Sequence, residues 1–456
     1  MSSTSKLFQK ESEKVAFDLK HRNTIRFNMS KYNAAVAKGK SRYSNLELAK
    51  QRASAIKENV LQNLDKYLIQ FEENISKRGA KVIYAKDNDE AISEILSILN
   101  SHETKLVVKS KSMTTEEIDF NKNLEDNNIE SVETDLGEYI VQVAGEKPYH
   151  IVTPAMHKSK EDVDELFNKN FDTPKNSTPE YLTNWVREKL REKYINADAG
   201  ITGANFLIAD IGAVALTENE GNGLMSTSFP KIQIAIAGIE KIIPSYKDLD
   251  LFLPLLAVHG TGQKITAYNS IFTGPKQEGE NDGPQEMYVI LLDNGRSKLF
   301  DKKEQHKALK CIRCGACLNA CPVYKNIGGY TYESTYSGPI GSVITPHLKD
   351  QKEYKHLSFA SSLCGKCTEV CPVKIDIHKL LLYNRRDAVE NGYSVFAEKI
   401  GMIGYKKAML NRNTLDAGGE FVKNKFSFVG KNAWGKMREI PRMKKSFSKQ
   451  YIENHS

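Results

Sequence analysis

The chain contains Cys311-Ile-Arg-Cys314-Gly-Ala-Cys317-Leu-Asn-Ala-Cys321-Pro322, and this stretch decides how its second half folds. The spacing C-x2-C-x2-C-x3-C-P is the run that holds a [4Fe–4S] cluster in bacterial ferredoxins. Three thiolates on one tight loop can each reach one iron of the same cube, and Gly315 lets the backbone approach the inorganic sulfides. The fourth cysteine precedes a proline, which is typical of a ligand to a second cluster.

The run recurs as Cys364-Gly-Lys-Cys367-Thr-Glu-Val-Cys371-Pro372, with its first cysteine replaced. Ser361 stands where the pattern requires that cysteine, three residues before Cys364. Because the last cysteine of each run binds the cluster of the other run, the ligand sets are unequal. We assign the first cluster Cys311, Cys314, Cys317 and Cys371, and the second cluster Cys321, Cys364 and Cys367.

The shortfall leaves the second cluster open to three interpretations. It is a [3Fe–4S] cluster, a [4Fe–4S] cluster whose fourth ligand is Ser361, His347 or His356, or a cluster with one iron that keeps an exchangeable ligand. We favour [4Fe–4S] for both clusters, with a non-cysteine ligand on the second. Zinc is the alternative, because C-x2-C also suits a tetrahedral zinc ion. Zinc sites have no use, however, for the third close cysteine or for the two Cys-Pro endings.

All seven cysteines lie between positions 311 and 371 of a 456-residue chain that is 40% hydrophobic. This ordinary globular composition predicts a packed core. The apolar runs at 232–237 and 251–258 are too short to span a bilayer, and residues 1–10 lack the apolar stretch of a signal peptide. We therefore expect a cytoplasmic protein with reduced thiols and no disulfide framework.

The formal net charge of +8 belongs to the C-terminal end. Residues 401–456 hold 12 Lys and Arg against 4 Asp and Glu, whereas the rest holds 53 of each sign. We expect the basic tail, residues 387–456, to dock on an acidic partner or an anionic membrane surface. Nucleic-acid binding is not expected, because the sequence has no zinc finger or RNP motif.

Residues 76–293 alternate between strand-like and helix-like stretches, which predicts an α/β domain with parallel strands. We expect strands at 80–85, 105–109, 205–209, 212–217, 232–237 and 286–292, and a helix at 89–99. A helical segment, residues 1–75, precedes this domain. A polar linker at 294–310 leads to a helical two-cluster ferredoxin domain at 300–386, in which 328–341 is predicted to be a loop.

Several polar residues of the α/β region are candidates for a ligand site. Lys109, Lys111, Ser112 and Glu116 could meet an anionic substrate, or could be surface charge pairs. Glu133, Asp135, Glu138 and Gln142 would line a pocket or a solvated strand face. Glu218 or Glu220 could act as a nucleophile, although a turn between strands explains them better. The Gly-rich stretch 259–263 is weak support for an anion site.

Seven further stretches, together with the order of the cysteine motifs, resemble a known family, the iron–sulfur B subunit of bacterial L-lactate utilisation complexes. They are Ser112-Met-Thr-Thr-Glu-Glu117, Val132-Glu-Thr-Asp-Leu-Gly-Glu-Tyr-Ile-Val-Gln142, His150-Ile-Val-Thr-Pro-Ala155, Gly200-Ile-Thr-Gly-Ala-Asn205, Ala209-Asp-Ile-Gly-Ala213, Gly238-Ile-Glu-Lys-Ile-Ile-Pro244 and Asn432-Ala-Trp-Gly-Lys-Met-Arg438. The resemblance implies a fold like that of sugar-phosphate isomerases and CoA transferases, with both clusters on the seven cysteines. The family also has three cysteines in its second motif.

The resemblance further implies oxidation of L-lactate to pyruvate by three components. This chain would be the electron-transfer subunit, non-catalytic or co-catalytic. Its partners would be a second lactate-utilisation-domain protein and a cysteine-rich iron–sulfur protein. Neither the electron acceptor nor the catalytic centre follows from it. Two alternatives stay open: a transferase or isomerase with structural clusters, and a redox-sensing module.

Overall fold

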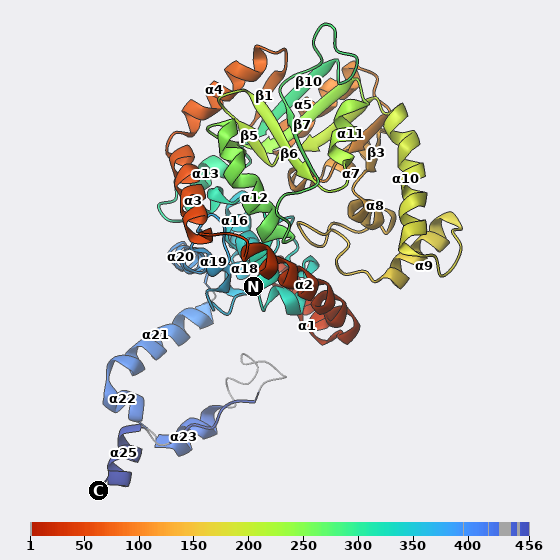
Figure 1. The fold of residues 1–456 in the computed structure, drawn as a ribbon. Coiled ribbons are helices and arrows are strands. Elements are labelled where there is room, and N and C mark those ends of the chain that lie inside the picture. Colours follow the sequence, from red (N-terminus) through yellow and green to blue (C-terminus); the bar gives the residue numbers. More distant parts are fainter. Residues whose placement is uncertain (1, 395, 418, 428–438, 445–446, 456) are drawn as a thin grey trace. The chain divides into compact units, whose positions relative to one another are not determined.

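The computed structural model describes residues 2–394, 396–417, 419–427, 439–444 and 447–455 (Figure 1). The chain forms two compact units, which divide between Ala388 and Val389. The first unit holds every strand and every cysteine of the described chain. The division into four segments stays a prediction.

A six-stranded parallel sheet forms the centre of the first unit. Its order is β1-β10-β7-β4-β2-β3, and the register places Ile234 of β7 between Tyr288 and Ile201. Both faces are covered, which explains why β7 is buried along its whole length and apolar except at Gln233. The strands are β1 (Lys81–Ala85), β2 (Leu106–Lys109), β3 (Glu130–Glu133), β4 (Ala199–Gly203), β7 (Ile232–Gly238) and β10 (Glu286–Leu292). The α/β prediction is confirmed.

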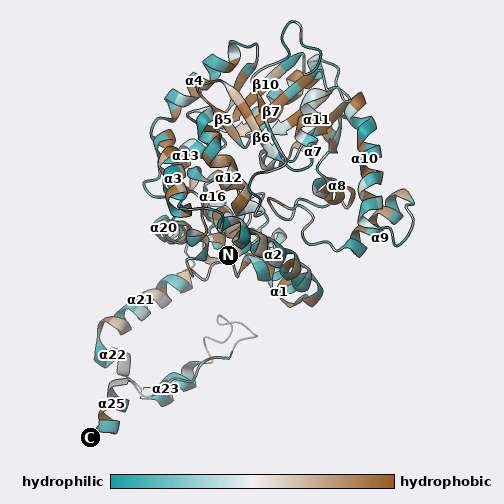
Figure 2. Ribbon diagram, in the orientation of Figure 1, coloured by the Kyte–Doolittle hydropathy of each residue, from teal (hydrophilic) through white to brown (hydrophobic). Residues whose placement is uncertain are grey.

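Helices cover both faces of this sheet, and neighbouring residues of a strand point to opposite faces. On one face, Ile95 of α5 (Asn88–Ser101) packs with Ile234. On the other face, Phe71 of α4 (Leu64–Ser76) packs with Ala235. Figure 2 shows the apolar colour concentrated in the strands, whereas helices at the outside, such as α10 (Pro179–Asn196), carry many hydrophilic residues.

A second, four-stranded sheet lies beside the first, in the order β8-β5-β6-β9. The stretches predicted as strands at 205–209 and 212–217 form one of its two antiparallel pairs. Gly212 has φ +58° in the turn between them, and a Cβ there would lie 2.2 Å from the backbone nitrogen of Ile75, so only glycine fits. The strands are β5 (Phe206–Ile208), β6 (Ala213–Glu218), β8 (Ile242–Ile243) and β9 (Tyr268–Phe272).

The remaining elements of the α/β region surround these sheets. The segment 132–142, where we considered a solvated strand face, is instead a strand followed by helix α8 (Leu136–Val143). The helix begins there because Asp135 caps it by accepting the N–H of Glu138 at 3.0 Å. The elements are α6 (Met113–Glu117), α7 (Phe120–Asp126), α8 (Leu136–Val143), α9 (Lys160–Phe171), α11 (Asn222–Ser228), α12 (Leu249–Gly260), η1 (Ile239–Lys241) and η2 (Tyr246–Asp248).

The N-terminal segment is helical, as predicted, and belongs to the core. It comprises α1 (Ser3–Phe17), α2 (Leu19–Lys40) and α3 (Leu46–Gln62), and α4 follows after a break at Asn63. Ile25 and Met29 of α2 share one apolar core with Phe252 of α12 and with Leu318 of the cysteine region. These helices therefore join the α/β region to the cysteine region.

The cysteine region is almost entirely short helices. Residues 294–310 are helical rather than the polar linker we expected, and the predicted loop at 328–341 already enters a helix at Gly338. The elements are α13 (Arg296–Phe300), η3 (Gln305–Lys310), α14 (Ala316–Ala320), α15 (Tyr324–Ile327), η4 (Tyr330–Tyr332), α16 (Gly338–Leu348), α17 (Gln351–Tyr354), α18 (His356–Phe359), α19 (Lys366–Glu369) and α20 (Ile377–Glu390).

The second unit is helical where it is described. It contains α21 (Phe396–Leu410), α22 (Arg412–Asp416), α23 (Gly419–Phe426) and α25 (Phe447–His455). The stretch 432–438 that contributed to the family resemblance lies outside the described residues. In the part of the chain that the structure covers, no helix is both long enough and apolar enough to cross a membrane.

Candidate iron–sulfur site

The first cysteine loop is shaped by two residues with positive φ. Arg313 has φ +59° and Gly315 has φ +75°, and Gly315 starts α14. This turn lets the N–H of Arg313 point at Sγ of Cys311, at 3.4 Å. A Cβ on Gly315 would lie 2.9 Å from Val152, so the loop packs tightly on a segment of the α/β region.

Four cysteines line one cavity beside this loop: Cys311, Cys314, Cys317 and Cys371. The last comes from the second motif, so the structure brings together the set that we assigned to the first cluster. Apolar side chains complete the wall, among them Ile151, Ile340 and Ile375. The N–H of Ile375 also points at Sγ of Cys371, at 3.3 Å. Thiolate donors with backbone N–H groups aimed at sulfur, in a dry cavity, fit an iron–sulfur cluster.

Burial raises the pKa of Cys314, Cys317 and Cys371. The pKa of Cys371 rises to about 11 through burial, and Cys311 raises it further. The pKa of Cys317 rises through burial and through Cys311, Cys314 and Cys371. Four thiolates would repel one another here unless cationic iron neutralised them, so cluster binding must displace protons.

The other three cysteines form a second group. Burial raises the pKa of Cys367 to about 11, and the charges of Cys321 and Cys364 raise it further. The N–H of Tyr324 points at Sγ of Cys321, at 3.5 Å. Cys364 is exposed. This group is therefore nearer to solvent than the first.

Ser361 takes the position in the second loop that Cys311 takes in the first. Leu363 has φ +55° and Gly365 has φ +77°, which repeats the turn of the first loop. Oγ of Ser361 accepts the N–H of Leu363 at 3.1 Å. The two histidines considered as ligands are engaged elsewhere: Nε2 of His347 lies 2.9 Å from Oδ1 of Asn384, and Nδ1 of His356 lies 3.0 Å from the carbonyl oxygen of Glu353.

A larger cavity, of about 340 Å³, adjoins the first loop. Its wall combines the ends of β2 and β6, the loop 151–154, the last turn of α12 and the first cysteine loop. We call it the junction cavity. Arg313 and Cys314 line both it and the cysteine-lined cavity. No residue pattern in the sequence indicated that these two cavities would meet.

Several predicted site residues lie in the wall of the junction cavity, but most are already paired. Nζ of Lys111 donates to the carbonyl oxygen of Val152 at 2.9 Å and lies 3.8 Å from Oδ2 of Asp135. Oε2 of Glu220 accepts the N–H of Leu136 at 3.0 Å. Burial and the nearby Asp135 raise the pKa of Glu220.

Glu218 lies in the same wall and caps a helix. Its two carboxylate oxygens accept the N–H groups of Gly223 at 2.7 Å and Leu224 at 2.9 Å, at the start of α11. Burial raises the pKa of Glu218. A carboxylate with both oxygens bound to backbone is poorly suited to act as a nucleophile. Gly260 and Thr261, from the Gly-rich stretch 259–263, line the wall as well.

A separate buried cluster collects the other candidates. Nζ of Lys109 lies 2.8 Å from Glu133, 3.5 Å from Glu116 and 3.7 Å from Glu138. Burial, with the charge of Glu133 next in importance, raises the pKa of Glu138 well above its usual range. Two further candidates make local bonds: Gln142 accepts the N–H of Glu133 and Ser112 caps α6. The charges are therefore buried pairs rather than surface pairs.

Sequence reasoning missed a buried ionic network next to the first loop. Arg296 donates to both oxygens of Glu117 at 2.9 Å and to Glu240 at 2.6 Å. Glu240 also accepts from Nη2 of Arg313 at 3.2 Å, and the guanidinium of Arg313 stacks on Tyr336 at 4.3 Å from the ring centroid. Arginine lowers the pKa of Glu240 to about 2 against the effect of burial.

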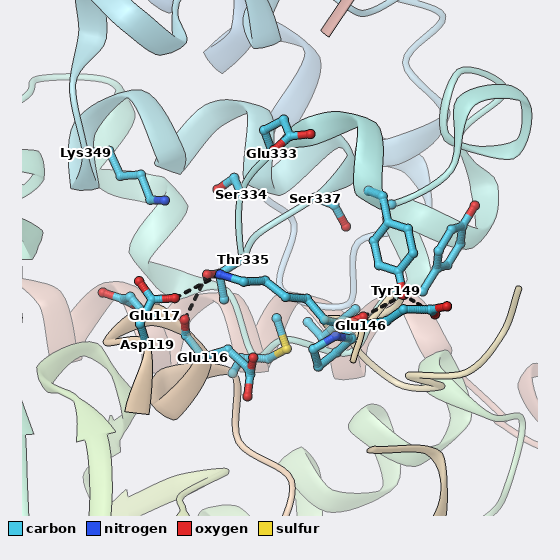
Figure 3. A pocket seen from close by; sticks show the side chains of 16 residues that line it. Glu116, Glu117, Asp119, Glu146, Tyr149, Glu333, Ser334, Thr335, Ser337 and Lys349 are labelled. Carbon is cyan, nitrogen blue, oxygen red and sulfur yellow. Dashed lines mark hydrogen bonds and ion pairs between the residues drawn. The ribbon is translucent and has the colours of Figure 1, made fainter. Parts of the chain in front are cut away.

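Figure 3 shows another cavity, of about 380 Å³, between the α6–α7 turn and the segment that joins the two cysteine motifs. Its walls carry several carboxylates, but these have cationic partners: Glu117 binds Arg296, and Asp119 lies 2.8 Å from Lys147. Lys349 faces them from the other side. We assign this cavity no ligand.

Comparison with known proteins gives two family matches and a group of close relatives. Residues 68–292 match the LUD domain, and residues 307–375 match the 4Fe-4S dicluster domain. Relatives called lactate utilization protein B are 46% identical in Bacillus velezensis and 47% identical in Bacillus subtilis, each over 78% of this chain and 75% of the relative. The Bacillus cytotoxicus relative is 42% identical over 90% of this chain and 89% of its own length.

A crystal structure of a DUF162 family protein from Deinococcus radiodurans is 15% identical and covers 50% of this chain and 98% of its own, with a TM-score of 0.27. The dicluster match and the two cysteine groups together indicate two [4Fe–4S] clusters rather than zinc ions. Among the described residues, no three His, Cys, Asp or Glu side chains are grouped to hold a single metal ion.

Proposed function

The chain belongs to the lactate utilization protein B family, and on that premise we propose that it is the iron–sulfur electron-transfer subunit of a complex that oxidises L-lactate to pyruvate. The relatives' name associates the family with lactate, and the dicluster domain supplies redox centres. When bound, two clusters supply one-electron carriers close enough for electrons to pass between them.

One observation carries the proposal: Cys314 lies in the wall of both the cysteine-lined cavity and the junction cavity. A ligand to the first cluster therefore faces the space at the ends of the α/β strands, where such folds bind small molecules. That arrangement gives electrons a short route between the α/β region and the cysteines.

The second cysteine group supplies the opposite end of the route. Tyr332 is 1% exposed, and its pKa is raised by burial and then by Cys321 and Cys317, one cysteine of each group. Tyr332 thus lies near both groups in the buried interior. Cys364, by contrast, is exposed, so a redox partner can approach the second group directly.

We propose two partners, a second lactate-utilisation-domain protein and a cysteine-rich iron–sulfur protein. The exposed face of the second cysteine group is one surface available to them. Helix α21 is another, because it exposes Phe396, Ile400 and Leu410. The basic tail could instead contact an anionic membrane surface.

Anaerobic reconstitution tests the proposal. The protein should hold two clusters that L-lactate reduces only when both partner proteins are present, and reduction can be followed by electron paramagnetic resonance. A preparation that holds no iron, or a strain that grows on lactate after deletion of this gene without a substitute, contradicts the proposal. If Glu218→Gln and Glu220→Gln abolish reduction of the clusters by L-lactate while both clusters stay intact, the transferase alternative is favoured.

A further inference from the structure

The wall of the junction cavity carries two buried polar groups that the described residues leave without a hydrogen-bond partner. They are Oγ of Ser110 and Nη1 of Arg313. Ser110 is 2% exposed, and the side chain of Arg313 is 10% exposed. An unpaired buried donor destabilises the fold, and a charged one does so more strongly. Two such groups in the wall of one cavity point to a polar ligand.

The guanidinium of Arg313 is fixed on one side, and its Nη1 is buried without a hydrogen-bond partner among the described residues. Nη2 donates to Glu240, and the planar group stacks on Tyr336, so it cannot turn away. A guanidinium held in a fixed plane is the group that best recognises a carboxylate, through charge-assisted hydrogen bonds. The end of the cavity next to Cys314 is therefore built for the anionic end of a ligand.

Ser110 supplies a second, neutral contact. It follows Lys109, the last residue of β2, at the carboxyl end of a parallel strand, where α/β sheets bind their ligands. A hydroxyl can donate or accept a hydrogen bond, so Ser110 suits either a hydroxyl or a carbonyl oxygen. The volume of about 340 Å³ is near the lower end for small-molecule sites, which favours a short ligand.

We propose that the junction cavity binds a short 2-hydroxy or 2-oxo acid, with its carboxylate on Arg313 and its second oxygen on Ser110. This inference rests on the proposed function and deepens it, because it places the acid beside a ligand of the first cluster. Arg313 and Ser110 bind and orient the acid.

Calorimetry on the full-length, anaerobically reconstituted protein tests this. L-lactate and pyruvate should each bind saturably. Both should also change the electron paramagnetic resonance signal of the cluster held by Cys314, and leave the signal of the other cluster unchanged. Propionate, which has no oxygen on the second carbon, should bind about 10-fold more weakly, as expected for one lost hydrogen bond.

Three variants locate the site. Arg313→Gln should weaken L-lactate binding about 10- to 100-fold, because it removes a charge-assisted contact. Ser110→Ala should weaken it about 3- to 10-fold. Lys349→Met removes a cation from the cavity of Figure 3 and should leave binding unchanged. Iron and sulfide are counted in each variant to show that both clusters are present. If Arg313→Gln fails to hold clusters, the binding measured for Ser110→Ala decides whether the acid binds in this cavity.

Three results overturn the inference: neither acid binds, propionate binds as tightly as L-lactate, or Lys349→Met weakens binding as much as Ser110→Ala. Each is distinguishable from failure of the proposed function. If the partner proteins pass electrons from L-lactate to this chain, while the chain alone binds neither acid, only the binding site is wrong.

Discussion

Ser361 and Cys311 occupy equivalent positions in two loops of the same conformation. Each accepts a backbone N–H from the residue two positions later, Leu363 in one loop and Arg313 in the other. Those two residues share a left-handed conformation, with φ of +55° and +59°. The second motif has therefore lost a thiol while its loop has kept the shape that binds a cluster.

This equivalence predicts that Ser361 is the fourth ligand of the second cluster. The reconstituted protein should hold about eight iron atoms, four for each cluster. Ser361→Ala should remove one iron and give the signal of an oxidised [3Fe–4S] cluster, whereas Ser361→Cys should keep about eight. Iron analysis and electron paramagnetic resonance measure both. His347→Gln and His356→Gln are the matched controls, and loss of iron from either one instead would transfer the role to that histidine.

The cysteine motifs were predictable because their spacing is local: within 311–322, two or three residues separate each ligand from the next. Strands such as β7 were predictable because a sheet covered on both faces favours a nearly continuous apolar run, which in β7 only Gln233 interrupts. The ionic network was not predictable. Arg296 lies in a Lys-rich stretch that looked like a linker, and its partners Glu117 and Glu240 are 179 and 56 positions away. Only the folded chain makes these residues neighbours.

Replacing Arg296 should lower the free energy of unfolding far more than replacing a surface cation. Its side chain is 1% exposed and bridges two buried carboxylates, so Arg296→Met removes the arginine partner of Glu117 and leaves Glu240 paired with Arg313. We expect a loss of about 3–5 kcal/mol in the free energy of unfolding, measured by urea denaturation. The control is Lys81→Met, which breaks an exposed pair with Glu286 and should cost at most about 1 kcal/mol. Equal losses would show that the network does not hold the fold together.

Lys57 should make stability depend on pH above neutrality. Burial lowers its pKa from 10.5 to about 7, and its ammonium donates to the carbonyl oxygens of Glu240 and Ile242. Between these two pKa values the unfolded chain binds more protons than the folded chain, so the free energy of unfolding rises with pH. Urea denaturation from pH 7 to 10 should show this rise in the native protein and a smaller one in Lys57→Met. Parallel pH profiles would contradict it.

The position of Glu218 separates the electron-transfer function from the transferase alternative. Because both carboxylate oxygens accept N–H groups of α11, we interpret Glu218 as a helix cap. Glu218→Gln keeps the shape but loses one of these bonds, because its amide NH2 group cannot accept an N–H, and it should cost about 1 kcal/mol of stability. With both clusters loaded and the partner proteins present, reduction by L-lactate should continue at the native rate.

A covalent role for Glu218 predicts the reverse pattern. Glu218→Gln would then abolish turnover while thermal unfolding stays close to native, and Glu218→Asp would recover part of the rate. Glu220→Gln tests the second candidate nucleophile in the same way, because Glu220 lies in the same cavity wall and accepts the N–H of Leu136. A loss of stability in Glu218→Gln without a change in the rate of reduction by L-lactate supports the role of Glu218 as a helix cap. A nucleophile must have an oxygen free to attack the substrate, whereas both oxygens of this carboxylate are bound to backbone N–H groups.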